Sequence, residues 1–178
     1  MTNQGTKEWR RVCARSDKSG ETNDCTVKAL AIATNSTYEK AHGALALRGR
    51  SYRKGTSMGL IFDTLKDWGY TVKTEYKRFH IERAERWEKM HGHTIPEDFP
   101  GLMGETATKA NKWRRSRWAK GRTIKSIVPH LPKRGVFLIE TSEHVLCVRA
   151  GKVHDWTDGR RHRITDVHRI IKEAKRDD

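Results

Sequence analysis

The chain has 178 residues, of which 35% are hydrophobic and 33% are charged, and its formal net charge at pH 7 is +15. This length suits one domain with a hydrophobic core, and the six Trp, four Tyr and four Phe residues argue against an intrinsically disordered chain. No apolar stretch approaches the roughly 18 residues of a membrane-spanning helix, and residues 1–7 lack the apolar core of a signal peptide.

The positive charge is unevenly distributed along the chain. Residues 105–134 contain ten Lys or Arg residues and a single acidic residue, Glu105. Such an excess favours an anionic partner, with nucleic acid as the first one to consider. The three cysteines match neither a disulfide framework nor a zinc ribbon, which indicates a reducing compartment, so we expect a cytoplasmic protein.

The N-terminal part is predicted to be a polar segment followed by three helices. Residues 1–23 are polar, with a loop at 16–21, and a helix is expected from Asp24 as its N-cap to about Asn35. Two further helices are predicted from Thr37 to about residue 48 and from Ser57 to about residue 68. Each has apolar residues at helical spacing and is followed by a glycine.

The remainder is predicted to be mostly strands, interrupted by an insertion. Residues 70–76 alternate like a strand, whereas residues 77–120 mix tryptophans and basic residues with prolines and glycines, and we interpret them as an insertion in one domain spanning 1–178. After a short helix that begins at Thr123, strands are expected at 135–140, 144–149 and 152–156, with a final amphipathic helix near 165–175. Helices followed by antiparallel strands indicate an α+β domain.

Cys25 is the strongest candidate for a reactive side chain. It lies where the loop becomes a helix, and the positive end of a helix dipole favours the thiolate, which is the nucleophilic form of cysteine. His144 and Asp155 lie on the predicted strands much further along the chain. A hairpin that turns at Ala150–Gly151 places residue 144 opposite residue 157, so Asp155 lies diagonally across from His144, within about 7 to 8 Å.

These residues carry a resemblance to a known family. Three islands resemble papain-like cysteine peptidases: Asn-Asp-Cys-Thr-Val-Lys-Ala-Leu-Ala (23–31), Gly-Arg-Thr-Ile (121–124), and Thr-Ser-Glu-His-Val-Leu-Cys-Val (141–148) followed by Gly-Lys-Val-His-Asp (151–155). Within that superfamily, the chain is most similar to small phage-encoded proteins of the peptidase C39-like type. The resemblance covers about half of the chain in three islands, and residues 77–120 and the basic tail lie outside it.

The resemblance implies a papain-like fold and a Cys25, His144 and Asp155 triad. Cys25 would attack a carbonyl, His144 would transfer the proton, and Asp155 would orient the imidazole. The resembled enzymes usually place a glutamine several residues before the cysteine to bind the oxyanion, but residues 16–23 contain none. Asn23, or the backbone amide of Cys25, is the candidate substitute.

Several alternatives stay open at this stage. Asp158 is a rival for the orienting acid, although it lies in a Thr-Asp-Gly sequence typical of a turn. His91 and His93 are spaced so that they could join a metal site, but a histidine pair in a glycine-containing loop is weak support, and no metal or cofactor is expected. Cys147 is expected to pack in the core, because cysteine is among the most buried residue types.

The end of the insertion is the candidate nucleic-acid-binding segment. Its basic residues would contact phosphates while its tryptophans stack on bases; the residues concerned are Lys109, Lys112, Trp113, Arg114, Arg115, Arg117, Trp118 and Lys120. In the alternative interpretation, this segment is a solvated helix whose tryptophans anchor it to the domain. An acidic protein would satisfy the same charge.

Two classes of function follow from the sequence. The first is a phage-type thiol hydrolase, a peptidase, isopeptidase or amidase acting on a peptide or protein substrate in the cytoplasm of the host cell. The second is a binding module on the same fold, with reduced or no catalysis, that engages nucleic acid or an acidic host protein through its basic surface. Neither class involves a membrane.

Overall fold

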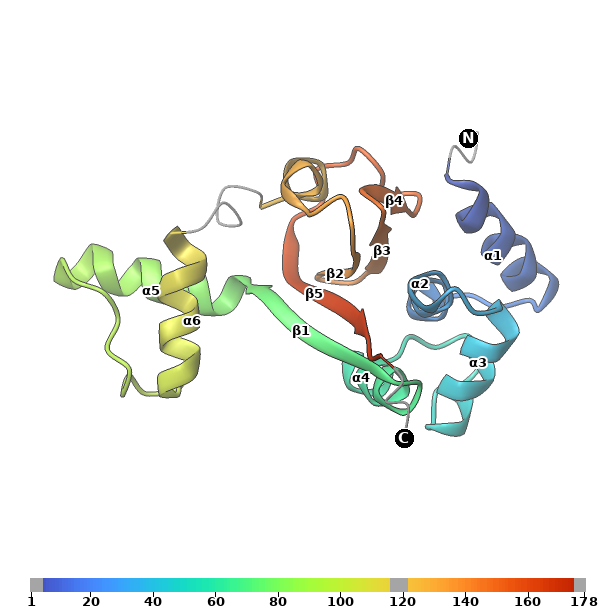
Figure 1. The fold of residues 1–178 in the computed structure, drawn as a ribbon, viewed down its shortest axis with the longest axis horizontal. Coiled ribbons are helices and arrows are strands. Elements are labelled where there is room, and N and C mark those ends of the chain that lie inside the picture. The colour runs from blue at the N-terminus through green and yellow to red at the C-terminus, as the bar shows by residue number, and fades with distance from the viewer. Residues whose placement is uncertain (1–4, 116–121, 175–178) are drawn as a thin grey trace.

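The computed structural model describes residues 5–115 and 122–174. Its elements in chain order are α1 (Lys7–Lys18), α2 (Cys25–Thr34), α3 (Tyr38–Leu47), α4 (Met58–Asp67), β1 (Tyr70–Lys77), α5 (Arg78–His91), α6 (Gly104–Arg115), α7 (Ile124–Ile127), the 3₁₀ turn η2 (Val128–His130), β2 (Val136–Thr141), β3 (Val145–Arg149), β4 (Lys152–His154) and β5 (Ile164–Lys172). The strands form one antiparallel sheet in the order β1-β5-β2-β3-β4 (Figure 1). The predicted α+β class is confirmed.

The sheet separates two hydrophobic cores. Helices α1 to α4 lie on one side of it, and their apolar side chains pack with Leu138, Val145, Cys147 and Ile170 from the strands (Figure 1). On the opposite face, the alternate strand residues pack with Ile124 and Ile127 of α7 and with side chains of α5 and α6. Because side chains alternate along a strand, successive residues of β2 and β3 enter different cores, which explains their continuous apolar runs.

The predicted helices α2, α3 and α4 are confirmed. Thr37, the predicted start of α3, is its N-cap, and its hydroxyl accepts from the Lys40 amide. Helix α2 ends at Asn35, which adopts the left-handed conformation with φ 54°. That conformation is tolerated by Asn better than by most residues, and it stops the helix there.

The structure differs from the predictions at both chain ends. Residues 7–18 lie in the segment described only as polar, and they form helix α1, which takes in the first three residues of the loop expected at 16–21. The buried side of α1 is made by Trp9, Val12 and Ser16, spaced at helical intervals. Only two of the buried residues of α1, Trp9 and Val12, are apolar, so the helical spacing of apolar residues is too brief to be recognised in the sequence.

The expected C-terminal helix near 165–175 is instead strand β5. Its apolar residues suit a helix by spacing, but Ile164, Val167, Ile170 and Ile171 are β-branched and therefore prefer strands. β5 lies between β1 and β2, with backbone pairing on both sides. This tertiary pairing outweighs any local helical preference.

The insertion is a helical hairpin that projects from the sheet beside β1. Helices α5 and α6 enclose a small core made by Ala84, Ile95, Leu102, Ala107 and Ala110, with Trp87 and Phe99 packed against it (Figure 1). None of the helices in the described part of the chain is both long and apolar enough to cross a membrane.

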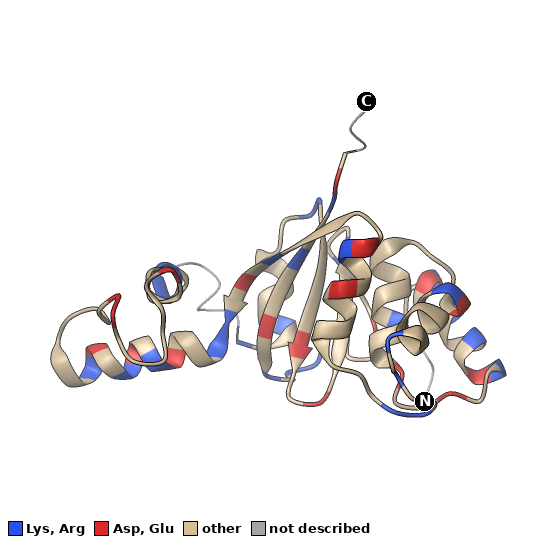
Figure 2. Ribbon diagram, turned by 90° about the horizontal axis from the view of Figure 1, so that it is seen from below, with Lys and Arg blue, Asp and Glu red and all other residues tan. Residues whose placement is uncertain are grey.

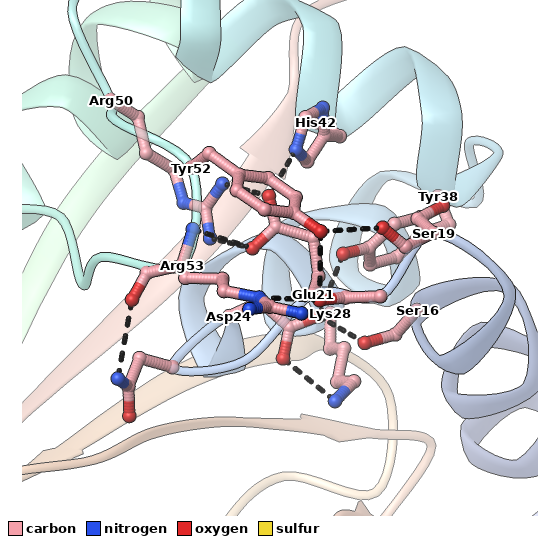
Figure 3. Close-up of polar contacts among 12 residues, drawn as sticks. Ser16, Ser19, Glu21, Asp24, Lys28, Tyr38, His42, Arg50, Tyr52 and Arg53 are labelled. Carbon is pink, nitrogen blue, oxygen red and sulfur yellow. Dashed lines mark hydrogen bonds and ion pairs between the residues drawn. The ribbon is translucent and has the colours of Figure 1, made fainter.

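A buried ion pair joins the loop before α2 to the loop before α4 (Figure 3). The side chains of Glu21 and Arg50 are fully inaccessible, and both guanidinium Nη atoms donate to the carboxylate at 3.1 Å. His42 Nε2 lies 2.6 Å from Glu21 Oε1, and the Arg53 amide donates to Oε2 at 3.0 Å. Burial disfavours the charged carboxylate, but these hydrogen bonds outweigh it and lower the pKa of Glu21 to about 2.

We predict that Arg50→Met destabilises the fold by about 3 to 5 kcal/mol at pH 7, because it leaves the Glu21 carboxylate buried without its partner. In the wild type, the stabilisation from Glu21 is complete above its unfolded pKa of 4.5 and is lost as the pH falls towards 2. Urea denaturation at pH 7 and pH 3 measures both effects. Arg48→Met, which removes a surface ion pair with Asp67, serves as the control and should cost less than about 1 kcal/mol. Equal losses for the two variants would contradict the role of the buried pair.

Candidate active site

Cys25 is the first residue of α2, as the sequence predicts. The preceding turn contains Asn23 in the left-handed conformation, with φ 52°, and this turn directs the chain into the helix. The amides of the first helical turn lack intrahelical acceptors and carry the positive end of the dipole. The Thr26 backbone amide is among the groups that lower the pKa of the Cys25 thiol, so the sulfur lies where a negative charge is stabilised.

Asp24 occupies the N-cap position, but its side chain makes no capping hydrogen bond. Instead, its buried carboxylate accepts from Ser16 at 2.5 Å, Tyr38 at 2.7 Å and Lys28 at 2.7 Å (Figure 3). The prediction of an N-cap is therefore correct for the position and wrong for the interaction. These contacts join α1, α2 and α3 immediately beside Cys25.

His144 and Asp155 are brought together by the β3–β4 hairpin. Its turn lies at Ala150 and Gly151, both with positive φ, and the pairing Arg149↔Lys152 and Cys147↔His154 has the register predicted from the sequence. His144 lies just before β3, where its carbonyl accepts from the Thr141 amide at 2.8 Å.

The imidazole of His144 is bound by Asp155 rather than by Asp158. His144 Nε2 lies 2.9 Å from both carboxylate oxygens of Asp155, which is 1% exposed. The Thr157 amide donates to Asp155 Oδ1 at 2.9 Å and fixes the carboxylate. Because Nε2 faces Asp155, the other ring nitrogen, Nδ1, is the one available to Cys25.

Cys25 and His144 are coupled electrostatically. Burial disfavours the Cys25 thiolate, but hydrogen bonds with His144 and with the Val145 backbone outweigh burial and lower the pKa of the thiol below 9.0. Burial also disfavours the His144 imidazolium, yet its hydrogen bonds with Asp155 and Cys25 raise the pKa of His144 to about 9. Both shifts favour a thiolate and imidazolium pair near neutral pH.

The pair opens into a cleft of about 400 Å³. Its walls come from α1, α2 and the loops at residues 55, 143 and 156, and its lining residues are Trp9, Asn23, Asp24, Cys25, Lys28, Gly55, Glu143, His144 and Trp156. The half-exposed Trp156 ring lies 5.5 Å from the His144 ring, and the Arg160 guanidinium covers it at 5.0 Å. Cys25 itself is partly exposed in this cleft.

Asn23, the predicted oxyanion donor, also lines this cleft. Its side-chain amide donates to the Arg53 carbonyl at 3.2 Å, which holds the amide group beside the entrance to α2. An amide nitrogen carries two hydrogens, so this bond leaves one for another acceptor. The Cys25 backbone amide, at the start of α2, is the second candidate donor.

The lining residues that the sequence did not identify as part of a site include Trp9, Lys28 and Trp156. Lys28 lies one helical turn after Cys25, and its ammonium group lies 5.7 Å from the Trp9 ring. Because residues three positions apart lie on the same face of a helix, the spacing between Cys25 and Lys28 could have identified Lys28 as a neighbour of the thiol. Trp9 could not be found in this way, because helix α1 itself was not predicted.

The predicted nucleic-acid-binding residues lie far from the cleft along the chain, and only some are described. Lys109, Lys112, Trp113, Arg114 and Arg115 belong to α6, whereas Arg117, Trp118 and Lys120 lie outside the described residues. Trp113 is 8% exposed and packs in the core with Tyr76 and Ile81, so it anchors α6 to the domain rather than presenting a free stacking face.

Acidic residues of α5 and α6 pair with part of this basic segment. Arg114 forms an ion pair with Glu88, and Lys109 forms one with Glu105. Figure 2 shows acidic and basic residues interleaved along α5. Lys112 and Arg115 are exposed, and neither forms an ion pair within residues 5–115 and 122–174.

Comparison of the chain with protein-family models, with curated proteins and with solved structures found no match.

We predict that Asp155→Asn moves the pH profile of Cys25 alkylation by iodoacetamide to higher pH. Loss of the carboxylate lowers the pKa of His144 from about 9, which removes the imidazolium that stabilises the thiolate. At pH 7 the rate should fall by about tenfold for each unit by which the thiol pKa rises above neutral. Asp158→Asn is the matched control and should leave the profile unchanged. A profile that moves in both variants, or in neither, would contradict the assignment of Asp155.

Proposed function

We propose that this protein is a thiol hydrolase of papain-like type, which cleaves a peptide, isopeptide or other amide bond through Cys25, His144 and Asp155. The observation that carries the proposal is that His144, which is bonded to the buried Asp155 carboxylate, lines one open cleft with Cys25 at a helix N-terminus, and that each of the two shifts the other's pKa towards the charged form. This combination supplies a nucleophile, a base and an orienting group in one place.

In the first half of the reaction, the Cys25 thiolate attacks the substrate carbonyl carbon and forms a carbon–sulfur bond. The negative charge moves to the carbonyl oxygen, which would accept hydrogen bonds from the Cys25 amide and Asn23. Imidazolium of His144 then gives its proton to the leaving nitrogen as the carbon–nitrogen bond breaks, leaving a thioester and a free amine.

In the second half, neutral His144 takes a proton from water, whose oxygen attacks the thioester. The carbon–sulfur bond breaks, and the acid product leaves with Cys25 again as thiolate and His144 again as imidazolium. Asp155 stays charged throughout and holds the ring in place, while the buried position of its carboxylate limits competition from water.

The fold is consistent with the papain-like assignment in three respects: the nucleophile begins a buried helix, the base and acid lie on an antiparallel hairpin, and that helix packs against the strand that follows the base. The phage origin and the cytoplasm of the host as its location rest on the sequence resemblance.

We predict that the wild-type chain releases p-nitrophenol from p-nitrophenyl acetate in a burst of one equivalent, with the acetyl group found on Cys25 by peptide mass mapping. Cys25→Ala should abolish the burst, and His144→Ala should slow it by about 10² to 10⁴-fold, the usual contribution of a general base. Cys13→Ser is the control, because burial raises the pKa of Cys13 to about 11 and makes that thiol unreactive. The proposal fails if Cys25→Ala retains the burst, or if the acetyl group lies on another residue.

A binding module for nucleic acid is the second candidate, and it is favoured by the net charge of +15 and the exposed Lys112 and Arg115. On this hypothesis, the affinity for single-stranded DNA falls steeply with salt, because phosphate contacts release counterions. Fluorescence anisotropy should show that Lys112→Glu with Arg115→Glu weakens binding and flattens its salt dependence, whereas Cys25→Ala changes neither. Binding that persists unchanged at high salt would exclude phosphate contacts.

A further inference from the structure

A second cluster of ionisable side chains lies on the sheet, and none of its members lines the cleft. Glu140 on β2 is paired in register with Asp166 on β5, and His168 follows two residues later on the same face of β5. One ligand atom from each of these three side chains lies within 4.8 Å of the others. The cluster therefore joins two central strands of the sheet.

His168 is held in one orientation by its surroundings. Its side chain is 2% exposed, and the Phe62 ring packs edge-on against it at 4.8 Å. Nδ1 lies 3.0 Å from the Thr74 hydroxyl, and Nε2 lies 2.7 Å from Glu140 Oε1. Histidines that bind metals characteristically use one nitrogen for the metal and the other for a fixed hydrogen bond. Thr74 supplies such a partner, and Nε2 points to the carboxylates.

The two carboxylates have no basic partner that neutralises both. Glu140 pairs with His168, whereas Asp166 forms no ion pair with any Lys or Arg in the described residues. Lys77 is opposite Asp166 across β1 and β5 and attracts it without reaching 4 Å. A cation bound between the carboxylates would relieve their mutual repulsion.

We propose that Glu140, Asp166 and His168 bind one Zn²⁺ ion, with Thr74 orienting His168. One imidazole nitrogen and two carboxylate oxygens are ligands that zinc accepts, at about 2.0 to 2.2 Å, with a fourth position left for water. The nitrogen ligand favours Zn²⁺ over Mg²⁺ or Ca²⁺, which prefer oxygen. This proposal departs from the expectation of no metal, and it is independent of the hydrolase proposal.

The test is calorimetric titration of the full-length Cys25→Ser chain with ZnCl₂, since that background removes the thiolate that would compete for zinc. We expect one Zn²⁺ per chain, and at least a tenfold loss of affinity in Glu140→Gln and in Asp166→Asn. Thr74→Val should weaken binding by about 10 to 100-fold, the usual effect of removing a residue that orients a ligand.

Two neighbours provide matched controls. Asp63 lines a cavity beside Thr74, and Thr71 on the same strand bonds to Glu173, so Asp63→Asn and Thr71→Val should leave zinc binding unchanged. Circular dichroism shows whether each variant is folded. If a ligand variant does not fold, the zinc affinity of Thr74→Val, which changes no ligand, tests the proposal instead. Absence of zinc binding, or equal affinity in Glu140→Gln, Asp166→Asn and the parent, overturns the proposal.

Discussion

The burial of helix α2 is the constraint on which the candidate site depends. Val27, Leu30 and Ala31 are inaccessible, and Ala29 and Ala33 allow α2 to approach the sheet closely. A close-packed interior permits little displacement of such a helix. The position of Cys25 in the cleft that it shares with His144 is therefore set by the core.

Three buried carboxylates organise the chain around the cleft, each through donors from different segments. The Glu21 carboxylate is hydrogen-bonded to side chains of α3 and of the loop at 50–53. The Asp24 carboxylate accepts hydrogen bonds from α1, α2 and α3. The Asp155 carboxylate is hydrogen-bonded to His144 and to the Thr157 backbone amide. A buried charge is costly unless it is fully hydrogen-bonded, so each carboxylate selects one arrangement of its loops. Asp155 differs from the other two because its main partner, His144, lines the cleft together with Cys25.

The parts of the fold and of the site that the sequence predicted are those governed by local rules. The helix after Asp24 and the hairpin at Ala150–Gly151 follow from periodicity and turn chemistry, and the hairpin register places Asp155 diagonally across from His144, within hydrogen-bonding reach. The failures depend on distant contacts. Strand β5 was mistaken for a helix because its pairing partners lie far away in the chain, and the role of Trp113 could not be read from α6 without Tyr76 and Ile81. The cluster of Glu140, Asp166 and His168 could not be predicted for the same reason, because these residues become neighbours only when β2 pairs with β5.

The central place of β5 also has a consequence for the order in which the protein can be built. Among the strands of residues 5–115 and 122–174, β1 pairs with β5 alone, so more than 80 residues must be synthesised after β1 before it can enter the sheet. Pairing between such distant segments is slow to form, and during translation the N-terminal helices leave the ribosome well before it can begin. A nascent chain therefore contains helix α2 with Cys25 before the hairpin beside His144 and Asp155 has formed and before the sheet is complete. The cleft therefore cannot be complete until the strands in the last third of this sequence have been synthesised.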